Sequence, residues 1–417
     1  MRSLVILVLA LAGPIYTHAL QGPANWPGFR GAGAEGTGSG PVPVTWDIAR
    51  SRNVQWRVPI AGLAISSPIV WNDRVFLTTA IPMAQPNGQN FRQRHVWKLL
   101  SLDRASGKVL WERTAHDGVP YMQRHPNGSY ANSTPVTNGT VVVAVFGTEL
   151  LAAFDMAGTP LWQKPFQVRS ARNAFESGSS PVIVQDLVIV QDDRDRDSSI
   201  VAYRLKDGSE VWRVARNDGP SQATPAVWTR PDGRRLLVTV AERGLRAHDA
   251  ATGAEVWRFG AKIAYGAATA AIANGLAVST GGDDIHAVRL NATGVATAAW
   301  STPGGGAYIP SPLVLGNIIY VLNDNGVLSA FDLQTGRKLT QVRTTSGEFC
   351  ASPVSADGRI YVFGGDGEAT ILRTSPSLEV IGHASMGGPV KATPAIAGGV
   401  LYVRTATHLV ALRETSR

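Results

Sequence analysis

The sequence has little cysteine, little charge and no long apolar run. Its single cysteine, Cys350, excludes an intrachain disulfide and a zinc cluster built on cysteines. Charged residues make up 17% of the 417 residues, below the ~25% of an average globular domain. Hydrophobic residues reach 44%, so we do not expect intrinsic disorder. No segment approaches the ~18 consecutive apolar residues that cross a membrane, which argues against an integral membrane protein.

Glycine and proline are abundant instead. The chain has 44 glycines and 25 prolines without a collagen-like period, which predicts many tight turns rather than long helices. The net charge is +8 and the sequence pI is about 9.8. The basic residues are spread along the chain, whereas a nucleic-acid-binding protein would concentrate them, so we expect no nucleic-acid partner.

The first 19 residues have the pattern of a secretory signal. Arg2 gives a short positive region, residues 4–12 are apolar, and Thr17-His18-Ala19 is typical of a cleavage site. No cysteine lies near this site to accept a lipid. We therefore expect residues 1–19 to be a cleaved signal peptide and the mature chain to be periplasmic or secreted.

A short string recurs along the whole chain and predicts the fold. Each copy is Ser or Thr followed by Pro and apolar residues. The copies start at Ser67, Thr134, Ser180, Thr224, Ser311, Ser352 and Thr393, with an eighth at Thr269 that has lost its proline. After a longer first interval, the spacing is about 41–46 residues, the length of one four-stranded propeller blade.

Each period continues with a turn, an apolar strand, a third strand and a polar turn, and in most periods a strand with a tryptophan follows. Turn signals every 8–12 residues leave no room for helices. We predict an all-β protein, an eight-bladed β-propeller of four-stranded antiparallel blades. The last period has only three strands, while Val54 to Ile60 is an unpaired tryptophan strand before the first copy. This N-terminal strand should complete and close the last blade. The expected organisation is thus a signal peptide (1–19), an N-terminal extension (20–53) and one propeller (54–417).

The string Ala-x-Asp-x-x-Thr-Gly-x-x-x-Trp, nearly whole in residues 247–257, resembles the tryptophan-docking motif of pyrroloquinoline quinone (PQQ) repeats. Residues 26–31 and 125–135 resemble segments of secreted PQQ-binding-like β-propeller repeat proteins. This superfamily includes quinoprotein alcohol dehydrogenases and also the lipoprotein scaffold of the outer-membrane β-barrel assembly machinery. The resemblance therefore implies the fold without fixing a function.

Quinoprotein dehydrogenases place the quinone on a tryptophan floor beneath adjacent cysteines, with Ca²⁺ and an Asp base. Adjacent cysteines are missing here, and no acidic cluster matches that calcium site. We assign no cofactor, no metal site and no catalytic residue with certainty. The alternative function is a PQQ-dependent oxidoreductase acting on an alcohol or sugar, which would use PQQ with Ca²⁺.

Three other patterns favour structural roles. Residues 193–197 alternate Asp and Arg like a calcium loop but lack its Gly and Glu, so we expect a solvated, charge-balanced turn. Seven of the histidines, at residues 95, 116, 125, 248, 286, 383 and 408, show no metal-ligand spacing and are expected at the surface or in turns. The tryptophans recur at one structural position, which indicates packing between blades rather than stacking with nucleic acid.

The entrances to the innermost strands should converge at the propeller axis. The residues two positions before each proline position are small: Ser66, Ser133, Ser179, Ala223, Ala268, Pro310, Ala351 and Ala392. The preceding positions are Ile65, Asn132, Gly178, Gln222, Ala267, Ile309, Cys350 and Lys391. We predict a ligand site in this axial funnel, formed by Tyr130, Asn132, Glu176, Gln222, Tyr265, Tyr308, Glu348 and Lys391. Loop residues Arg124, Arg169 and Arg172 would add positive charge. The other interpretation is that these groups bind one another and channel water.

The favoured function is a binding scaffold whose funnel or rim recognises a partner protein, a glycan or a small anionic ligand. We expect it to be a monomer. The sequence does not identify the partner.

Overall fold

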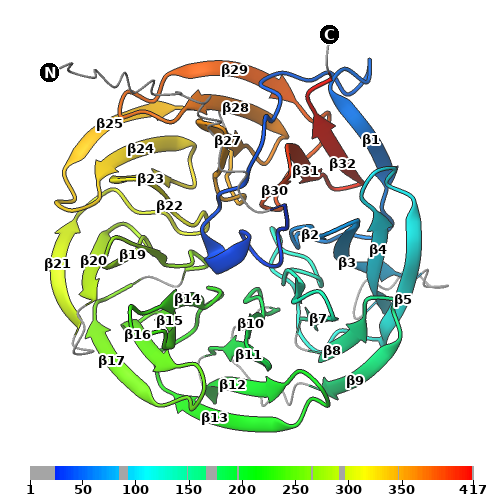
Figure 1. Cartoon of the computed structure of the whole chain (residues 1–417), viewed down its shortest axis with the longest axis horizontal. Coiled ribbons are helices and arrows are strands. Elements are labelled where there is room, and N and C mark those ends of the chain that lie inside the picture. Colours follow the sequence, from blue (N-terminus) through cyan, green and yellow to red (C-terminus); the bar gives the residue numbers. More distant parts are fainter. Residues whose placement is uncertain are drawn as a thin grey trace, which may run out of the picture.

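The computed structural model describes residues 24–83, 93–147, 149–165, 176–194, 197–263, 266–290, 296–345 and 347–415. In these residues, eight four-stranded antiparallel sheets are arranged as blades around a central axis (Figure 1). The predicted eight-bladed propeller is confirmed. The predicted signal peptide, residues 1–19, lies outside the described residues.

The first four blades consist of consecutive strands, counted from the axis outward. Blade 1 contains β2 (Ile69–Trp71), β3 (Arg74–Pro82), β4 (His95–Asp103) and β5 (Val109–Gly118). Blade 2 contains β6 (Val136–Thr137), β7 (Val141–Phe146), β8 (Leu150–Asp155) and β9 (Pro160–Pro165). Blade 3 contains β10 (Val182–Val184), β11 (Leu187–Asp192), β12 (Ser198–Arg204) and β13 (Glu210–Arg216). Blade 4 contains β14 (Ala226–Thr229), β15 (Arg235–Ala241), β16 (Gly244–Asp249) and β17 (Glu255–Gly260).

The next three blades repeat this order, and the eighth takes its outer strand from the N-terminal part of the chain. Blade 5 contains β18 (Ala271–Ala273), β19 (Leu276–Ser279), β20 (Ile285–Leu290) and β21 (Ala296–Thr302). Blade 6 contains β22 (Leu313–Leu315), β23 (Ile318–Leu322), β24 (Val327–Asp332) and β25 (Lys338–Arg343). Blade 7 contains β26 (Val354–Ala356), β27 (Arg359–Phe363), β28 (Glu368–Arg373) and β29 (Val380–Ser385). Blade 8 contains β30 (Ala395–Ala397), β31 (Val400–Arg404), β32 (His408–Arg413) and β1 (Val54–Pro59).

The N-terminal strand closes the ring as the sequence predicts. β1 pairs antiparallel with β32, with Trp56 opposite Ala411 and Val58 opposite Leu409. The next residue, Ile60, continues the contact because its N–H donates to the carbonyl of Thr407 over 2.9 Å. Closure gives the last blade a fourth strand, so neither end of the repeat is left as an open sheet edge.

The core lies between neighbouring blades, where the middle strands of each sheet are buried on both faces. Between blades 1 and 2, for example, Phe76 and Trp97 belong to the same buried cluster as Phe146 and Phe154. Every blade therefore depends on its neighbours for the burial of apolar surface, which is the main stabilising term of the fold.

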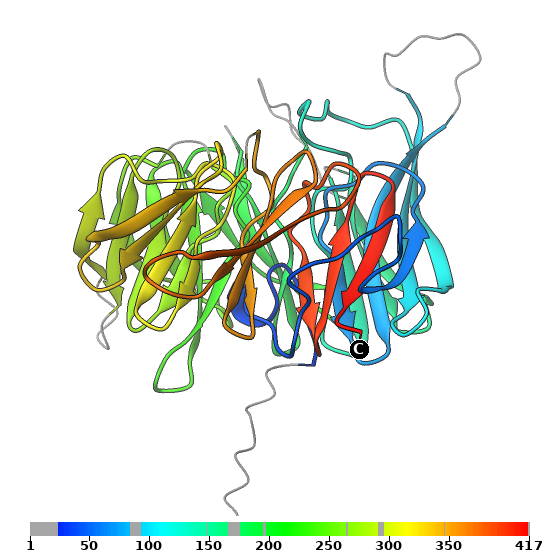
Figure 2. The same cartoon turned by 90° about the horizontal axis from the view of Figure 1, so that it is seen from above.

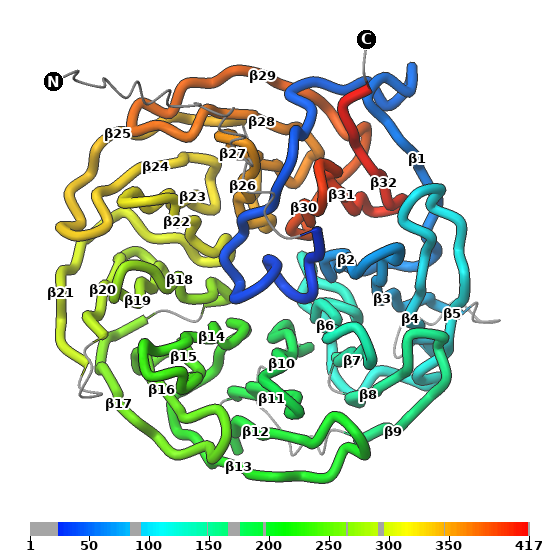
Figure 3. The backbone as a smooth tube through the Cα atoms, viewed as in Figure 1, coloured from blue at the N-terminus to red at the C-terminus, as the bar shows by residue number. Residues whose placement is uncertain are grey.

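The segment before β1 covers the centre of the ring on one side (Figures 1 and 3). It contains the one short 3₁₀ turn of the described residues, η1 (Ala32–Ala34). Backbone hydrogen bonds join Trp26 to Val70, Pro27 to Thr137, and Gly36 and Gly38 to Ser355. These contacts reach the innermost strands of blades 1, 2 and 7, next to the turns that lead to the second strands. We call residues 24–40 the plug.

An axial belt of hydroxyl groups joins the blades at the inner strands. From blade 2 to blade 8, the Ser or Thr at this repeat position accepts a hydrogen bond from the backbone N–H of the equivalent residue in the preceding blade. Seven such bonds, with N···O distances of 2.9–3.1 Å, connect Ser67, Thr134, Ser180, Thr224, Thr269, Ser311, Ser352 and Thr393 in order. Each bond pairs a buried N–H that would otherwise cost about 1–3 kcal/mol.

The tryptophans join the blades at the outer circumference, as predicted. Five outer-strand indoles donate their N–H to a carbonyl in the third-strand turn of the next blade, whereas the buried N–H of Trp257 in β17 has no such partner in the described residues. The pairs are Trp56 with Arg104, Trp111 with Met156, Trp162 with Leu205, Trp212 with Ala250 and Trp300 with Leu333, at 2.8–3.2 Å. The glycine of the same turn packs on the indole ring, so a side chain has no room there. At Gly208, an added Cβ would lie 2.7 Å from the ring of Trp162.

We therefore expect Gly208→Ala to lower the free energy of unfolding by about 2–5 kcal/mol, through a strained backbone and an overpacked tryptophan. The matched control is Gly304→Ala, because Gly304 has the same φ of +69° but open space around its added Cβ. In the control, the free energy of unfolding should fall only by the backbone strain, about 1–2 kcal/mol. Urea denaturation of both variants measures the difference, and equal losses would show that the tryptophan contact contributes nothing.

Candidate functional site

A pocket of about 330 Å³ lies on the axis, next to the hydroxyl belt. Among the predicted funnel residues, Asn132, Glu176, Gln222, Tyr308 and Lys391 line it. The pocket is also lined by all eight residues that stand two positions before the Ser or Thr of the hydroxyl belt, and Cys350 is one of them. Phe29 of the plug also lines the pocket. Its phenyl group therefore closes the pocket on the side of the propeller that the plug covers.

The remaining predicted residues lie differently. The Tyr130 ring packs against His95, with ring centroids 4.6 Å apart, and its carbonyl accepts the indole N–H of Trp97 at 2.7 Å. Tyr130 thus belongs to the packing between blades 1 and 2. Glu348 is not among the pocket residues but holds one of them, since its Oε2 accepts from the Asn127 amide at 3.1 Å. Tyr265, Arg169 and Arg172 lie outside the described residues.

Asn127 bridges the two sides of the pocket entrance. It lies in the long connection between blades 1 and 2, yet its Oδ1 accepts from Lys391 Nζ at 3.0 Å and its Nδ2 donates to Glu348. Arg124 stabilises this connection because its guanidinium donates to the carbonyls of Pro126 and Gly128. Residues 125–128 therefore reach from blade 2 to blades 7 and 8, and we call them the bridging loop.

Charge and burial differ around the pocket. Lys391 has no carboxylate within 4.0 Å in the described part of the chain, so its ammonium is paired with the neutral Asn127 amide alone. Cys350 is half-buried, and burial raises the pKa of its thiol. A cation that is partly withdrawn from water attracts anions more strongly than one in bulk solvent.

The residues of this pocket do not fit PQQ. The quinone of the dehydrogenases rests on tryptophan and is acidic, whereas the aromatic residues here are Phe29, His125 and Tyr308, and Lys391 is the one lining residue with a permanent positive charge. In the described residues, no group of three or more His, Cys, Asp or Glu side chains is close enough to hold a metal ion. We therefore derive no quinone chemistry for this pocket.

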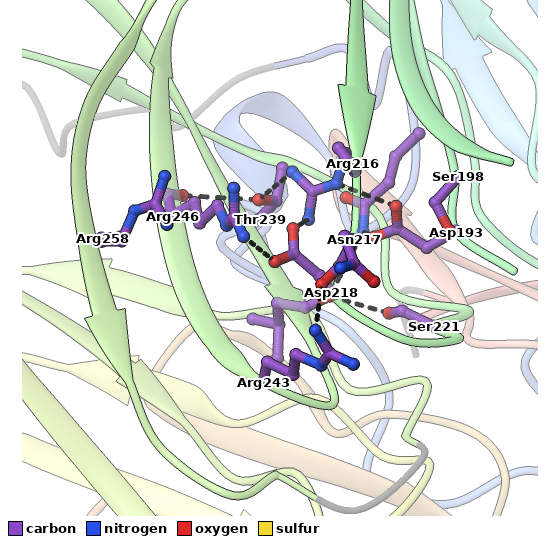
Figure 4. Close-up of polar contacts among 12 residues, drawn as sticks. Asp193, Ser198, Arg216, Asn217, Asp218, Ser221, Thr239, Arg243, Arg246 and Arg258 are labelled. Carbon is purple, nitrogen blue, oxygen red and sulfur yellow. Dashed lines mark hydrogen bonds and ion pairs between the residues drawn. The ribbon is translucent and has the colours of Figure 1, made fainter. Parts of the chain in front are cut away.

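A second site lies where blades 3 and 4 meet (Figure 4). Here Arg216, at the end of β13, donates through Nε to Asp193 at 2.8 Å and contacts Asp218 at 3.0 Å. Asp218 in turn pairs with Arg246 of β16. Arg216, Asp193 and Asp218 have almost fully buried side chains, so the charges stabilise one another out of water.

The network continues outward to the surface. Arg246 pairs with Glu255 at 3.0 Å, and Glu255 also accepts from the exposed Arg258 at 2.6 Å. Above these residues is an open hollow of about 530 Å³, whose lining includes Arg216, Arg243, Arg246, Arg258 and Phe259. Its lining has no carboxylate-bearing residue. We call it the arginine hollow. An adjoining hollow adds Lys262 and shares Arg243, though it also contains Glu242.

The predicted solvated turn at residues 193–197 is wrong in part, because Asp193 and Arg194 are only 5% and 9% exposed. The reason is that Arg216 reaches Asp193 from the neighbouring strand end, while Arg194 pairs with Asp192 at 2.7 Å. Asp195 and Arg196 lie outside the described residues. Burial raises the pKa of Asp193 to about 6, partly offset by the Arg216 cation.

His248 is also buried, contrary to the expected surface or turn position, and so is His95. An arginine can only donate, so Nε2 of His248 must accept from Arg216 at 3.2 Å, and Nδ1–H then donates to the carbonyl of Gly253 at 3.1 Å. This arrangement requires neutral imidazole. Burial and the Arg216 cation lower the pKa of His248 to about 4.

Known proteins resemble this chain in sequence and in fold. The family described as "Outer membrane protein assembly factor BamB" matches residues 98–240, 241–377 and 324–416. BamB of Shewanella oneidensis is 24% identical over 247 residues, covering 55% of this chain and 60% of that protein. BamB of Burkholderia pseudomallei is 29% identical over 102 residues, covering 24% of this chain and 26% of that protein. The matched part therefore spans less than two thirds of either relative.

Solved structures show the same fold at low sequence identity. BamB from Moraxella catarrhalis aligns with a TM-score of 0.61 and 16% identity, covering 87% of this chain and 98% of that chain. Quinohemoprotein alcohol dehydrogenase from Comamonas testosteroni aligns with a TM-score of 0.67 and 11% identity, covering 94% and 81%. These likenesses confirm the PQQ-type propeller and do not by themselves distinguish a scaffold from a dehydrogenase.

The neutral state of His248 gives a pH test. Its folded pKa of about 4 lies below the unfolded value of ~6.5, so the unfolded chain binds the extra proton and this contribution to stability is lost as pH falls from 6.5 to 4. His248→Gln cannot take up that proton. Relative to the wild type, we expect the variant to gain up to about 1.4 kcal/mol per pH unit of acidification in that window. Urea denaturation at several pH values measures this; a constant difference would refute a neutral buried His248.

Proposed function

Because the chain belongs to the family described as outer membrane protein assembly factor BamB, we propose that it is a scaffold that binds a partner protein. The binding surface is the arginine hollow, and the bound element is an acidic segment of the partner. The observation that carries this proposal is the convergence of four arginines on one hollow whose lining has no carboxylate-bearing residue.

The hollow suits recognition of carboxylates for two reasons. Arginine presents several N–H donors in a plane and can bind a carboxylate with two of them. The buried ion pairs to Asp193 and Asp218 hold Arg216 and Arg246 in place before a partner arrives, which reduces the entropy lost on binding. Phe259 adds apolar contact surface to the same hollow.

The compartment is part of the proposal. The positive and apolar pattern of the first 19 residues supports export, which agrees with a role beside the outer membrane. In the described residues, no helix is long and apolar enough to cross a membrane. We therefore propose a periplasmic scaffold that works as a monomer, since the ring is closed by its own N-terminal strand.

Photo-crosslinking tests the partner and the surface together. Benzoylphenylalanine in place of Phe259 keeps an aromatic group in the hollow, and the same probe at the exposed Tyr121 reports on a distant loop. In the envelope of producing cells, we expect the first probe to form an adduct with an outer-membrane protein or an assembly component, through an acidic peptide. The Tyr121 probe should not form it.

Charge reversal provides the control. Arg243→Glu with Lys262→Glu should abolish the Phe259-probe adduct, because both basic residues beside the hollow become acidic. The matched double reversal, Arg337→Glu with Lys108→Glu, changes two exposed residues in third-strand turns and should leave it intact. An adduct that survives the first reversal, or one formed through a basic peptide, would contradict the proposal.

A further inference from the structure

We propose that the axial pocket is a separate binding site for a small organic oxyanion, such as a short carboxylate or a phosphate monoester. The site is formed by the hydroxyl belt, Lys391, Phe29 and the bridging loop. It lies apart from the arginine hollow and does not depend on the proposed scaffold function.

The hydroxyl belt supplies donors. Six belt residues line the pocket: Ser67, Thr134, Ser180, Thr224, Ser352 and Thr393. Five of these hydroxyls, those of Thr134, Ser180, Thr224, Ser352 and Thr393, accept a backbone N–H. A hydroxyl that accepts still has its own hydrogen to donate. No protein acceptor takes these hydrogens within the described residues, so the axial wall offers several O–H donors to a ligand with acceptor oxygens.

Lys391 supplies the charge. Its Nζ contacts the Asn127 amide at 3.0 Å, and in the described part of the chain no carboxylate lies within 4.0 Å of it. Two carboxylates are near this lysine's pocket. Glu348 lies outside the lining and accepts from Asn127, whereas Glu176 lines the pocket from the connection before blade 3, away from the Lys391 connection before blade 8. Lys391 therefore favours a negative ligand on its own side of the axis.

Enclosure and apolar contacts define the rest of the ligand. The plug covers one side of the ring and places Phe29 in the pocket, while Asn127 of the bridging loop lies on the other side, near Lys391. Ile65 and Ile309 face the same space. A volume of about 330 Å³ is at the lower end for small-molecule sites. A compact anion with a short apolar tail satisfies both parts of the lining.

The sole cysteine of the chain makes the test specific. Cys350 lines the pocket, so a bound ligand should protect it from a small maleimide. We would measure the labelling rate at pH 8.5, because burial raises the pKa of the thiol. The probes are butyrate and propyl phosphate, with butylamine and butanol as controls of the same size. We expect at least a five-fold slower rate with one or both anions and no change with the controls.

Variants separate recognition from folding. Lys391→Met should weaken the affinity for the protecting anion at least ten-fold by titration calorimetry, Lys391→Arg should retain it, and all should melt like the wild type. Lys338→Met, in the outer strand of blade 6, is the matched control and should bind normally. Protection by butylamine or butanol, no anion binding by calorimetry, or unchanged binding by Lys391→Met would overturn the proposal. Because Phe259-probe crosslinking is a separate measurement, either proposal can fail alone.

Discussion

The hydroxyl belt is the interaction on which the rest of the structure depends. A propeller must hold its innermost strands together at an axis where there is no room for large side chains. Here the serine or threonine of every repeat after the first accepts the backbone N–H of the preceding blade, so a small side chain satisfies a buried donor and fixes the spacing between blades. The following proline needs no such partner, because it has no N–H.

The tryptophans perform the same task at the circumference with a different residue type. There the gap between blades is wider, and an indole ring fills it while its N–H reaches the next blade. Both contacts come from one repeat, so each period encodes its own strands and its attachment to the next blade. That consistency explains why the repeat spacing predicted the number of blades, the turn signals predicted four strands in each, and the unpaired tryptophan strand at residues 54–60 predicted closure of the last blade.

The site was predictable where it follows the repeat. Asn132, Gln222 and Lys391 occupy the same position of the repeat, two residues before the belt residue. In every blade the residue at that position lines the axial pocket. Contacts that leave the repeat were not predictable. Asn127 meets Glu348 and Lys391 across 221 and 264 residues, and Arg216 reaches Asp193 from another strand end. The alternating charges of residues 193–197 are typical of a polar turn. Asp193 is buried because it pairs with Arg216, a partner that the local sequence does not reveal.

Departures from the repeat also explain why both proposed sites are where they are. The plug binds innermost strands next to the turns that lead to the second strands and covers that side of the axis. The arginine hollow and the bridging loop both include residues of connections that join the outer strand of one blade to the inner strand of the next. These connections lie on the face opposite the plug (Figure 2). The hydroxyl belt at the axis and the tryptophan contacts at the circumference hold neighbouring blades together, so the blades do not close around a ligand. Recognition must then come from side chains that are already in position. Buried ion pairs and the Asn127 bridge provide that rigidity in an otherwise repetitive ring.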